Sequence, residues 1–123
     1  MPFQYTLANL LAANEGALAV LFLDDSGEVV DLACTEHEPF QMKIVGAYVG
    51  IYLRQLSAVF EQAQLGTPKV LHIEKDDVHF YATALPDGYY LVLVQHRPAL
   101  VARARETLER ARREIAREIF AEP

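Results

Sequence analysis

The sequence contains one cysteine, no tryptophan and few basic residues before its last quarter. Because Cys34 is the single cysteine among 123 residues, no disulfide can form within the chain, which excludes the disulfide-stabilised secreted domains. The four histidines are scattered and do not show the spacing of a zinc site. Neither GxxxxGK(S/T) nor GxGxxG, the glycine-rich patterns of phosphate binding, occurs. We therefore expect no bound cofactor or metal.

Positive charge is scarce except at the C-terminus. The net charge is −6, and residues 1–96 hold 12 acidic and 4 basic side chains, whereas residues 97–123 hold 5 acidic side chains and 7 arginines. Binding of nucleic acid requires a concentrated basic face, so we expect no nucleic-acid partner. The arginines alternate with glutamates, a pattern typical of a solvated, salt-bridged helix face rather than of a surface for anionic lipid.

Long apolar runs without charge are also absent. The most apolar window, residues 40–60, contains Lys43 and Arg54, so we expect no insertion into a membrane. The N-terminal stretch MPFQYTLANLLAA has no basic residue before its apolar part, unlike a signal peptide, and no long N-terminal arm is expected. A 13.8-kDa chain buries roughly two-thirds of its surface on folding, which suffices for one core. We predict a cytoplasmic single domain, residues 1–123.

The apolar periodicity predicts three helices and five strands. Proline at position 39 suits the first turn of a helix, and Leu65-Gly66-Thr67-Pro68 is a helix stop signal. The fold class is therefore α+β, an α-β-β-α-β-β-β-α sandwich with a five-stranded antiparallel sheet, the long helix on one face and the terminal helices on the other. The predicted helices are 3–14, 39–65 and 98–120, the last overhanging the sheet, and the predicted strands are 17–24, 28–34, 69–75, 78–84 and 88–95.

The turn Asp76-Asp77 sets a testable strand register. If it is a two-residue hairpin loop, Lys75 lies opposite Val78, and each earlier residue pairs in step. One face of this hairpin then carries a uniformly apolar set, Leu71, Ile73, Phe80 and Ala82. The other face carries Val70, His72, Glu74, His79, Tyr81 and Thr83.

The predicted helix 39–65 is apolar on more than one side. One stripe holds Met42, Val49, Leu53 and Phe60, and a second holds Val45, Tyr48, Tyr52, Leu56 and Val59. A helix with two apolar sides needs two partners, of which the sheet is one. Gly46 and Gly50 lie one turn apart and each costs about 1 kcal/mol relative to alanine, so close packing must compensate. That packing is either against the chain's own sheet or against a second helix.

Three groups of polar residues are candidate chemical sites. Cys34 with His37 and Glu38 has the residue types of a thiol nucleophile, base and orienting group, but a buried cysteine at a strand end is the simpler interpretation. His72, Glu74 and His79 share one sheet face and are either zinc ligands or a cross-strand Glu–His pair. The segment 24–28, DDSGE, lacks the ligand spacing of a calcium loop and is explained by turn chemistry. We therefore expect no enzyme activity and nominate no catalytic residue.

The order of these segments resembles the roadblock/dynein light chain family over nearly the whole chain. The resemblance rests on GALAVLFLDDSGEVVDLA (16–33), the helix ending in Leu65-Gly66, KVLHIEK (69–75), VHFYATALPDGYYLVLV (78–94) and the final helix. The alternatives are longin-like and profilin-like domains, which share this layered arrangement of strands and helices. The arginine-rich final helix looks longer than the family minimum and leaves room for an additional contact.

The resemblance implies a non-enzymatic protein that forms dimers, with sheets joined edge to edge and long helices side by side. Members of that family bind small Ras-like GTPases, as in bacterial polarity and gliding, or act as adaptor subunits, as in dynein. For this chain we expect a homodimer through the helix 39–65 and the edge strand 69–75, which has only lysines at its ends as protection. The expected dimer interface is Val45, Gly46, Tyr48, Gly50, Tyr52, Leu56, Val70, His72 and Glu74, and the expected partner-binding residues are Arg54, Gln55 and Glu61.

The first functional hypothesis is a regulator or scaffold that binds a small Ras-like GTPase and biases its switch state. The alternative is a structural adaptor subunit of a larger motor- or scaffold-associated assembly, without regulation of a GTPase. An enzyme or small-molecule sensor has the least support, because the sequence shows no convergent polar cluster.

Overall fold

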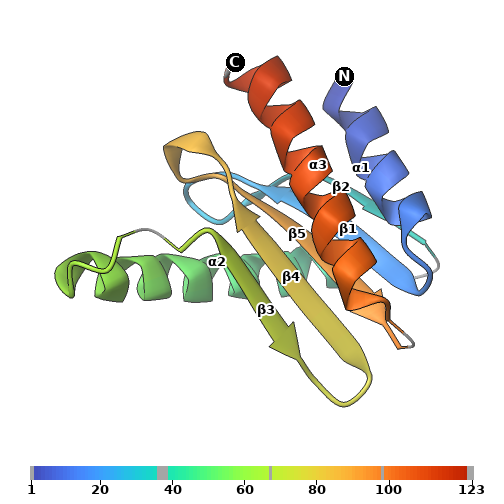
Figure 1. Cartoon of the computed structure of the whole chain (residues 1–123), viewed down its shortest axis with the longest axis horizontal. Coiled ribbons are helices and arrows are strands. Elements are labelled where there is room, and N and C mark those ends of the chain that lie inside the picture. The colour runs from blue at the N-terminus through green and yellow to red at the C-terminus, as the bar shows by residue number, and fades with distance from the viewer. Residues whose placement is uncertain (1, 36–38, 67, 98, 122–123) are drawn as a thin grey trace.

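The sheet is the centre of the molecule. The computed structural model describes residues 2–35, 39–66, 68–97 and 99–121. Its five strands are antiparallel to their neighbours and lie in the order β2-β1-β5-β4-β3 (Figure 1). The predicted α+β class and element order are confirmed. The strands are β1 (Ala17–Leu23), β2 (Val29–Cys34), β3 (Val70–Glu74), β4 (Val78–Ala84) and β5 (Tyr90–His96).

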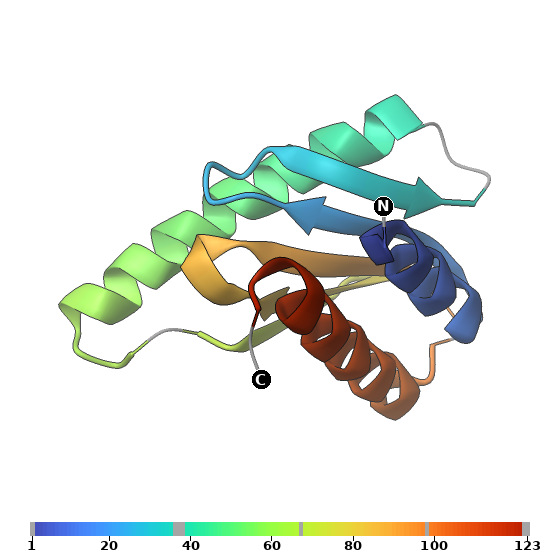
Figure 2. The ribbon, with the colours of Figure 1, turned by 90° about the horizontal axis from the view of Figure 1, so that it is seen from above.

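The helices lie on both sides of this sheet. Figure 2 shows α2 (Pro39–Gln62) on one side and both α1 (Pro2–Ala13) and α3 (Val101–Ile119) on the other, as predicted. We call the side covered by α1 and α3 the closed face and the side that carries α2 the α2 face. The strand β1 lies between these layers, so its run ALAVLFL is buried on both faces.

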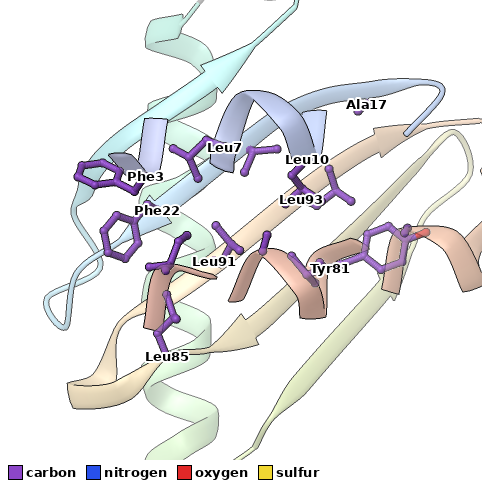
Figure 3. Close-up of a cluster of buried hydrophobic side chains, with 14 of the residues drawn as sticks. Phe3, Leu7, Leu10, Ala17, Phe22, Tyr81, Leu85, Leu91 and Leu93 are labelled. Carbon is purple, nitrogen blue, oxygen red and sulfur yellow. The ribbon is translucent and has the colours of Figure 1, made fainter. Parts of the chain in front are cut away.

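The closed face holds the larger core. Phe3, Leu7 and Leu10 of α1 pack on Phe22 of β1 and Leu93 of β5 (Figure 3). From α3, one narrow stripe joins them, because apolar residues recur at steps of three and four. Ile119 continues the same spacing but is exposed, and Ala116 is buried instead. The buried residues of α3 are Ala104, Leu108, Ala111, Ile115 and Ala116.

The α2 face holds a smaller core. Met42 and Leu53 of α2 pack with Leu21 of β1 and Val92 of β5. The helix lies mainly over β2 and β1 rather than over β4 and β3. Ser57 of α2 also shares a hydrogen bond of 2.9 Å with the Tyr90 hydroxyl, which fixes the helix against the start of β5.

The end of α2 differs from the predicted stop at Leu65-Gly66. Gln64 adopts a left-handed φ of 60°, and its N–H donates to the Glu61 carbonyl at 3.1 Å. The Leu65 N–H donates to the Phe60 carbonyl at 2.9 Å, which completes a Schellman motif. The helix therefore ends at Gln62, because the left-handed residue is Gln64 and not the glycine that favours this conformation.

The bounds of β5 and α3 also shift. A short 3-10 turn, η1 (Pro86–Gly88), with Asp87 at φ 60°, delays β5 from the expected residue 88 to Tyr90. The expected start of the last helix, Pro98, lies outside the described residues, and α3 begins at Val101. At its other end, Phe120 packs edge-on against Tyr89 at 5.2 Å between ring centroids. The end of α3 is therefore held against the core.

Candidate functional site

The outward side of α2 is the most apolar exposed surface of the described helices. Its residues recur three and four positions apart, so they share one face of the helix. Both predicted tyrosines of this surface are exposed. We call the surface the outer α2 stripe, and its exposed fractions are Ile44 44%, Tyr48 58%, Ile51 40%, Tyr52 62% and Val59 58%.

The outer α2 stripe is separate from the side of the helix that is buried against the sheet. Met42 and Leu53 on the opposite side are 6% and 1% exposed and fill the core on the sheet. The predicted second apolar side is therefore real, and no segment among the described residues covers it. Contiguous exposed apolar surface of this kind marks interaction sites in proteins.

The edge strand β3 lies at one end of the sheet and, among the described strands, pairs with β4 alone. The predicted register is confirmed: Ile73 lies opposite Phe80, Glu74 lies opposite His79, and the Lys75 N–H donates to the Val78 carbonyl at 2.8 Å. The outer backbone groups of β3 are thus free to pair with another strand.

The β3–β4 hairpin also leaves apolar side chains uncovered on the α2 face. Leu71, Val78 and Phe80 are only half-buried, and Ile73 is 43% exposed. The reason is the position of α2, which lies over β2 and β1. We call these four residues the hairpin patch. The hairpin patch and the outer α2 stripe thus both expose apolar side chains on the side of the molecule that carries α2.

Gly46 and Gly50 point into the chain's own core. A Cβ on Gly46 would lie 2.8 Å from Leu21 Cδ2, and a Cβ on Gly50 would lie 2.7 Å from the Gly27 Cα in the β1–β2 turn. Of the two alternatives left open by the sequence, close packing on the own sheet is therefore the one observed. Both glycines are buried in the single chain, and their place in an interface with a second copy stays a prediction.

The other predicted interface residues occupy different positions. Val45 packs partly on the core, and Leu56 is half-buried, so both border the outer α2 stripe. On β3, Val70, His72 and Glu74 are exposed along the closed-face side of the edge. The predicted partner-binding residues Arg54, Gln55 and Glu61 are all exposed on α2.

His72 of β3 and His79 of β4 form a polar cross-strand contact at this edge. His72 Nε2 lies 2.8 Å from His79 Nδ1, and Glu74 Oε1 lies 3.8 Å from His79 Nε2. The His72 ring stacks on Tyr81 at 4.5 Å between centroids. Burial, followed by the neighbouring His79, lowers the pKa of His72 below its usual value. Burial, followed by the charge of Glu74, raises the pKa of Tyr81.

This geometry favours the cross-strand interpretation over the zinc site. The two imidazole nitrogens face each other as hydrogen-bond partners, and no group of three His, Cys, Asp or Glu in the described part of the chain can hold a metal ion. The Asp24 carboxylate accepts hydrogen bonds from the N–H groups of Ser26 and Glu28, both at 2.9 Å, as turn chemistry predicts.

Cys34 is half-buried at the end of β2, and its candidate partners His37 and Glu38 lie outside the described residues. Across the ranges that the structure describes, no helix combines the length and the apolar character needed to cross a membrane.

Comparison with solved structures identifies the fold. No family model matches the sequence, and no curated protein is similar enough to count as a match. Among solved structures, Myxococcus xanthus MglB superposes with a TM-score of 0.88 at 11% identity, over 99% of this chain and 98% of that one. A Streptomyces avermitilis Roadblock/LC7 domain gives 0.84 at 12% identity, over 94% and 96%. The chain has the roadblock/LC7 fold.

A further structure with this fold is an MglB in a tetrameric arrangement. It superposes with a TM-score of 0.84 at 18% identity and covers 94% of this chain and 86% of that one. The resemblance noted from the sequence is thus confirmed at the level of the roadblock fold.

Sequence reasoning missed part of the exposed surface of this roadblock fold. Ile44 and Ile51 were not assigned to either stripe, although they follow the same helical spacing as Tyr48 and Tyr52. The register places Ile73 and Phe80 on the apolar face of the hairpin, but it does not show that both are only partly covered. The register was correct, and what could not be read from it is that α2 lies mainly over β2 and β1.

Proposed function

We propose that this chain acts as a dimer that binds a small Ras-like GTPase and biases its switch state, without contributing a catalytic side chain. The observation that carries the proposal is the exposed apolar side of α2 next to an uncovered sheet edge, on the fold shared with MglB. We further propose that the protein is cytoplasmic and non-enzymatic.

Assembly through β3 and α2 accounts for both exposed surfaces at once. Antiparallel pairing of β3 with the β3 of a second copy satisfies the unpaired backbone groups of the edge. The same pairing brings apolar surface of the second copy toward the hairpin patch and the outer α2 stripe. Burying such side chains is favourable by about 25 cal/mol per Å² of apolar surface. The tetrameric MglB arrangement supports self-association as a property available to this fold.

Binding of a GTPase is proposed at the exposed polar residues of α2. Arg54, Gln55 and Glu61 lie beside the outer α2 stripe and stay accessible in the single chain. A protein without catalytic groups can still act on a GTPase by holding its mobile switch segments in one arrangement, which shifts their population. Arg54 is the one arginine before residue 97, and we assign it a contact rather than a catalytic role.

The assembly is tested by light scattering at micromolar concentration. We expect twice the chain mass of 13.8 kDa. A stable mass of one chain would reject the homodimer. The expected dimer also loses mass on dilution, since mass action couples association to concentration.

The GTPase partner is tested by titrating the protein into small Ras-like GTPases encoded beside its gene, loaded with GDP or with a GTP analogue. We expect binding that prefers one nucleotide state. Binding to neither state at tens of micromolar would reject regulation of a GTPase and support the adaptor alternative. The matched variant is Arg54→Ala: if it alone abolished a stimulated hydrolysis, the assignment of Arg54 as a contact residue would be wrong.

A further inference from the structure

The His72–His79 contact joins the edge strand to the interior of the sheet. His79 is 4% exposed and sits on β4, whereas His72 is exposed on β3 and is the middle residue of that five-residue strand. Their nitrogens are 2.8 Å apart, and both rings are near-parallel to Tyr81, at 17° for His72 and 10° for His79. The three rings form one stack across the two strands.

The hydrogen bond limits how many protons the two rings can hold. When both rings are neutral, one N–H donates to the lone pair of the other ring. One added proton keeps this bond, because a cationic ring still donates to a neutral one. A second added proton removes the last lone pair between the two nitrogens. Two cationic donors then face each other at the distance of the former bond, and the contact must open.

The charged groups around the pair act in opposite directions on an added proton. Glu74 on β3 lies 3.8 Å from His79 Nε2 and balances one positive charge. Arg105 of α3 adds a positive charge that disfavours protonation of His72. From β5, the neutral Gln95 side chain accepts a hydrogen bond from the Tyr81 hydroxyl through Oε1 at 3.1 Å. Farther along β3, Glu106 and Glu109 of α3 border a depression lined by Val70 and Thr83.

We propose that the His72–His79 pair makes assembly through the β3 edge sensitive to acid. The second proton separates the rings, moves His72 off Tyr81 and disturbs the middle of the edge strand. In an edge-paired dimer His72 lies next to the second strand, so its ring has the least room to move away. This inference rests on the proposed dimer. The low exposure of His79 directs the change outward, to the ring on β3.

The test measures the dimer dissociation constant by analytical ultracentrifugation at pH 7.5 and pH 5.5. For the wild-type protein we expect a rise of at least tenfold at pH 5.5. His72→Gln supplies an amide for the hydrogen bond but does not titrate, so its rise is expected to stay below threefold. The matched control is His96→Gln, because His96 is exposed and its Nδ1 contacts its neighbour's carbonyl oxygen at 2.7 Å. It should behave as the wild type.

General charge effects have the opposite sign and do not mimic this result. The sequence pI is about 5.1, so acidification from pH 7.5 to pH 5.5 reduces the magnitude of the negative net charge. The weaker repulsion between copies favours self-association. An equal pH response of the wild type and His72→Gln would overturn the inference. So would tighter association of the wild type at pH 5.5.

A second measurement separates failure of the inference from failure of the proposed dimer. If the wild type is monomeric at pH 7.5, the dimer proposal fails, and NMR titration of the histidine rings then tests the pair in the single chain. Two coupled titration steps of the rings, with loss of the His72–Tyr81 ring contact in the step at lower pH, would support opening of the His72–His79 contact by the second proton. Independent titration of His72 and His79 at ordinary values would overturn it.

Discussion

The two faces of the sheet are covered unequally by helices. On the closed face, α1 and α3 lie side by side and are joined by the Asn14–Thr107 and Thr6–Glu114 hydrogen bonds, at 2.9 and 3.1 Å. On the α2 face, one helix lies mainly over β2 and β1, and the hairpin patch is left half-covered.

This difference separates folding from recognition. The closed face completes its core within one chain, so its residues determine the stability of the fold. The α2 face keeps apolar surface in solvent, including the outer α2 stripe, which a single chain gains nothing by exposing. Substitutions on the closed face should therefore act on unfolding, and substitutions on the outer α2 stripe should act on association.

The largest expected effect is loss of a closed-face side chain. Leu108 is 1% exposed in the larger core, so Leu108→Ala should lower the free energy of unfolding by about 2–5 kcal/mol. Urea denaturation at fixed protein concentration measures this. The matched truncation Val59→Ala, on the outer α2 stripe, should change unfolding of the monomer by less than about 1 kcal/mol. Equal costs would break the distinction between the two faces.

A charge in the outer α2 stripe should weaken association with little effect on the single chain. We expect Tyr48→Glu to raise the dimer dissociation constant roughly 10–100-fold, or about 1.4–2.8 kcal/mol, because the carboxylate would be desolvated on pairing. The control Tyr5→Glu changes an exposed tyrosine of α1 on the opposite side of the sheet. Sedimentation at neutral pH compares the two variants. The assignment fails if Tyr5→Glu weakens association as much as Tyr48→Glu.

A methyl group at Gly50 should strain the contact of α2 with its own sheet. The new Cβ would meet the Gly27 backbone at 2.7 Å, which costs roughly 1–3 kcal/mol and is offset by about 1 kcal/mol of helix propensity. Gly46→Ala is the paired variant. Its Cβ meets the ends of the Leu21 and Val29 side chains, at 2.8 and 3.1 Å, rather than backbone, so the loss should be smaller. Thermal unfolding measures both, and a stabilised Gly50→Ala would contradict this packing.

The smallest effect concerns an ion pair on the surface of α3. The Glu109 carboxylate accepts hydrogen bonds from Arg112 at 2.8 and 2.9 Å, and this contact lowers the pKa of Glu109. A carboxyl pKa that is lowered on folding stabilises the fold at any pH above the group's ordinary pKa of 4.5. This stability is lost as the pH falls through the lowered pKa. With 40% of the side chain exposed, Glu109→Gln should cost at most about 0.5 kcal/mol at pH 7. Urea midpoints at pH 7 and pH 3 should show this difference disappearing, and a difference that persists at pH 3 would contradict the sign.

Much of the fold was predictable because local rules and the tertiary structure agree. The register of β3 and β4 followed from a two-residue turn and the period of two along a strand. The two-sided apolar pattern of α2 predicted that Tyr48 and Tyr52 lie on a second apolar side of the helix, which needs a partner besides the sheet, and both are exposed. Which second chain meets them stays a prediction, since a sequence pattern shows that a surface needs a partner and does not identify one.

The amino-acid sequence by itself determined the element types, the strand register and the apolar second side of α2, because each depends on residues close together in the chain. The tertiary structure alone decided that Gly46 and Gly50 face the β1–β2 hairpin and that Ile73 and Phe80 lie partly beyond the cover of α2. Periodicity gives the direction of a side chain relative to its own element. How far one helix extends across a five-stranded sheet depends instead on packing between segments distant in sequence.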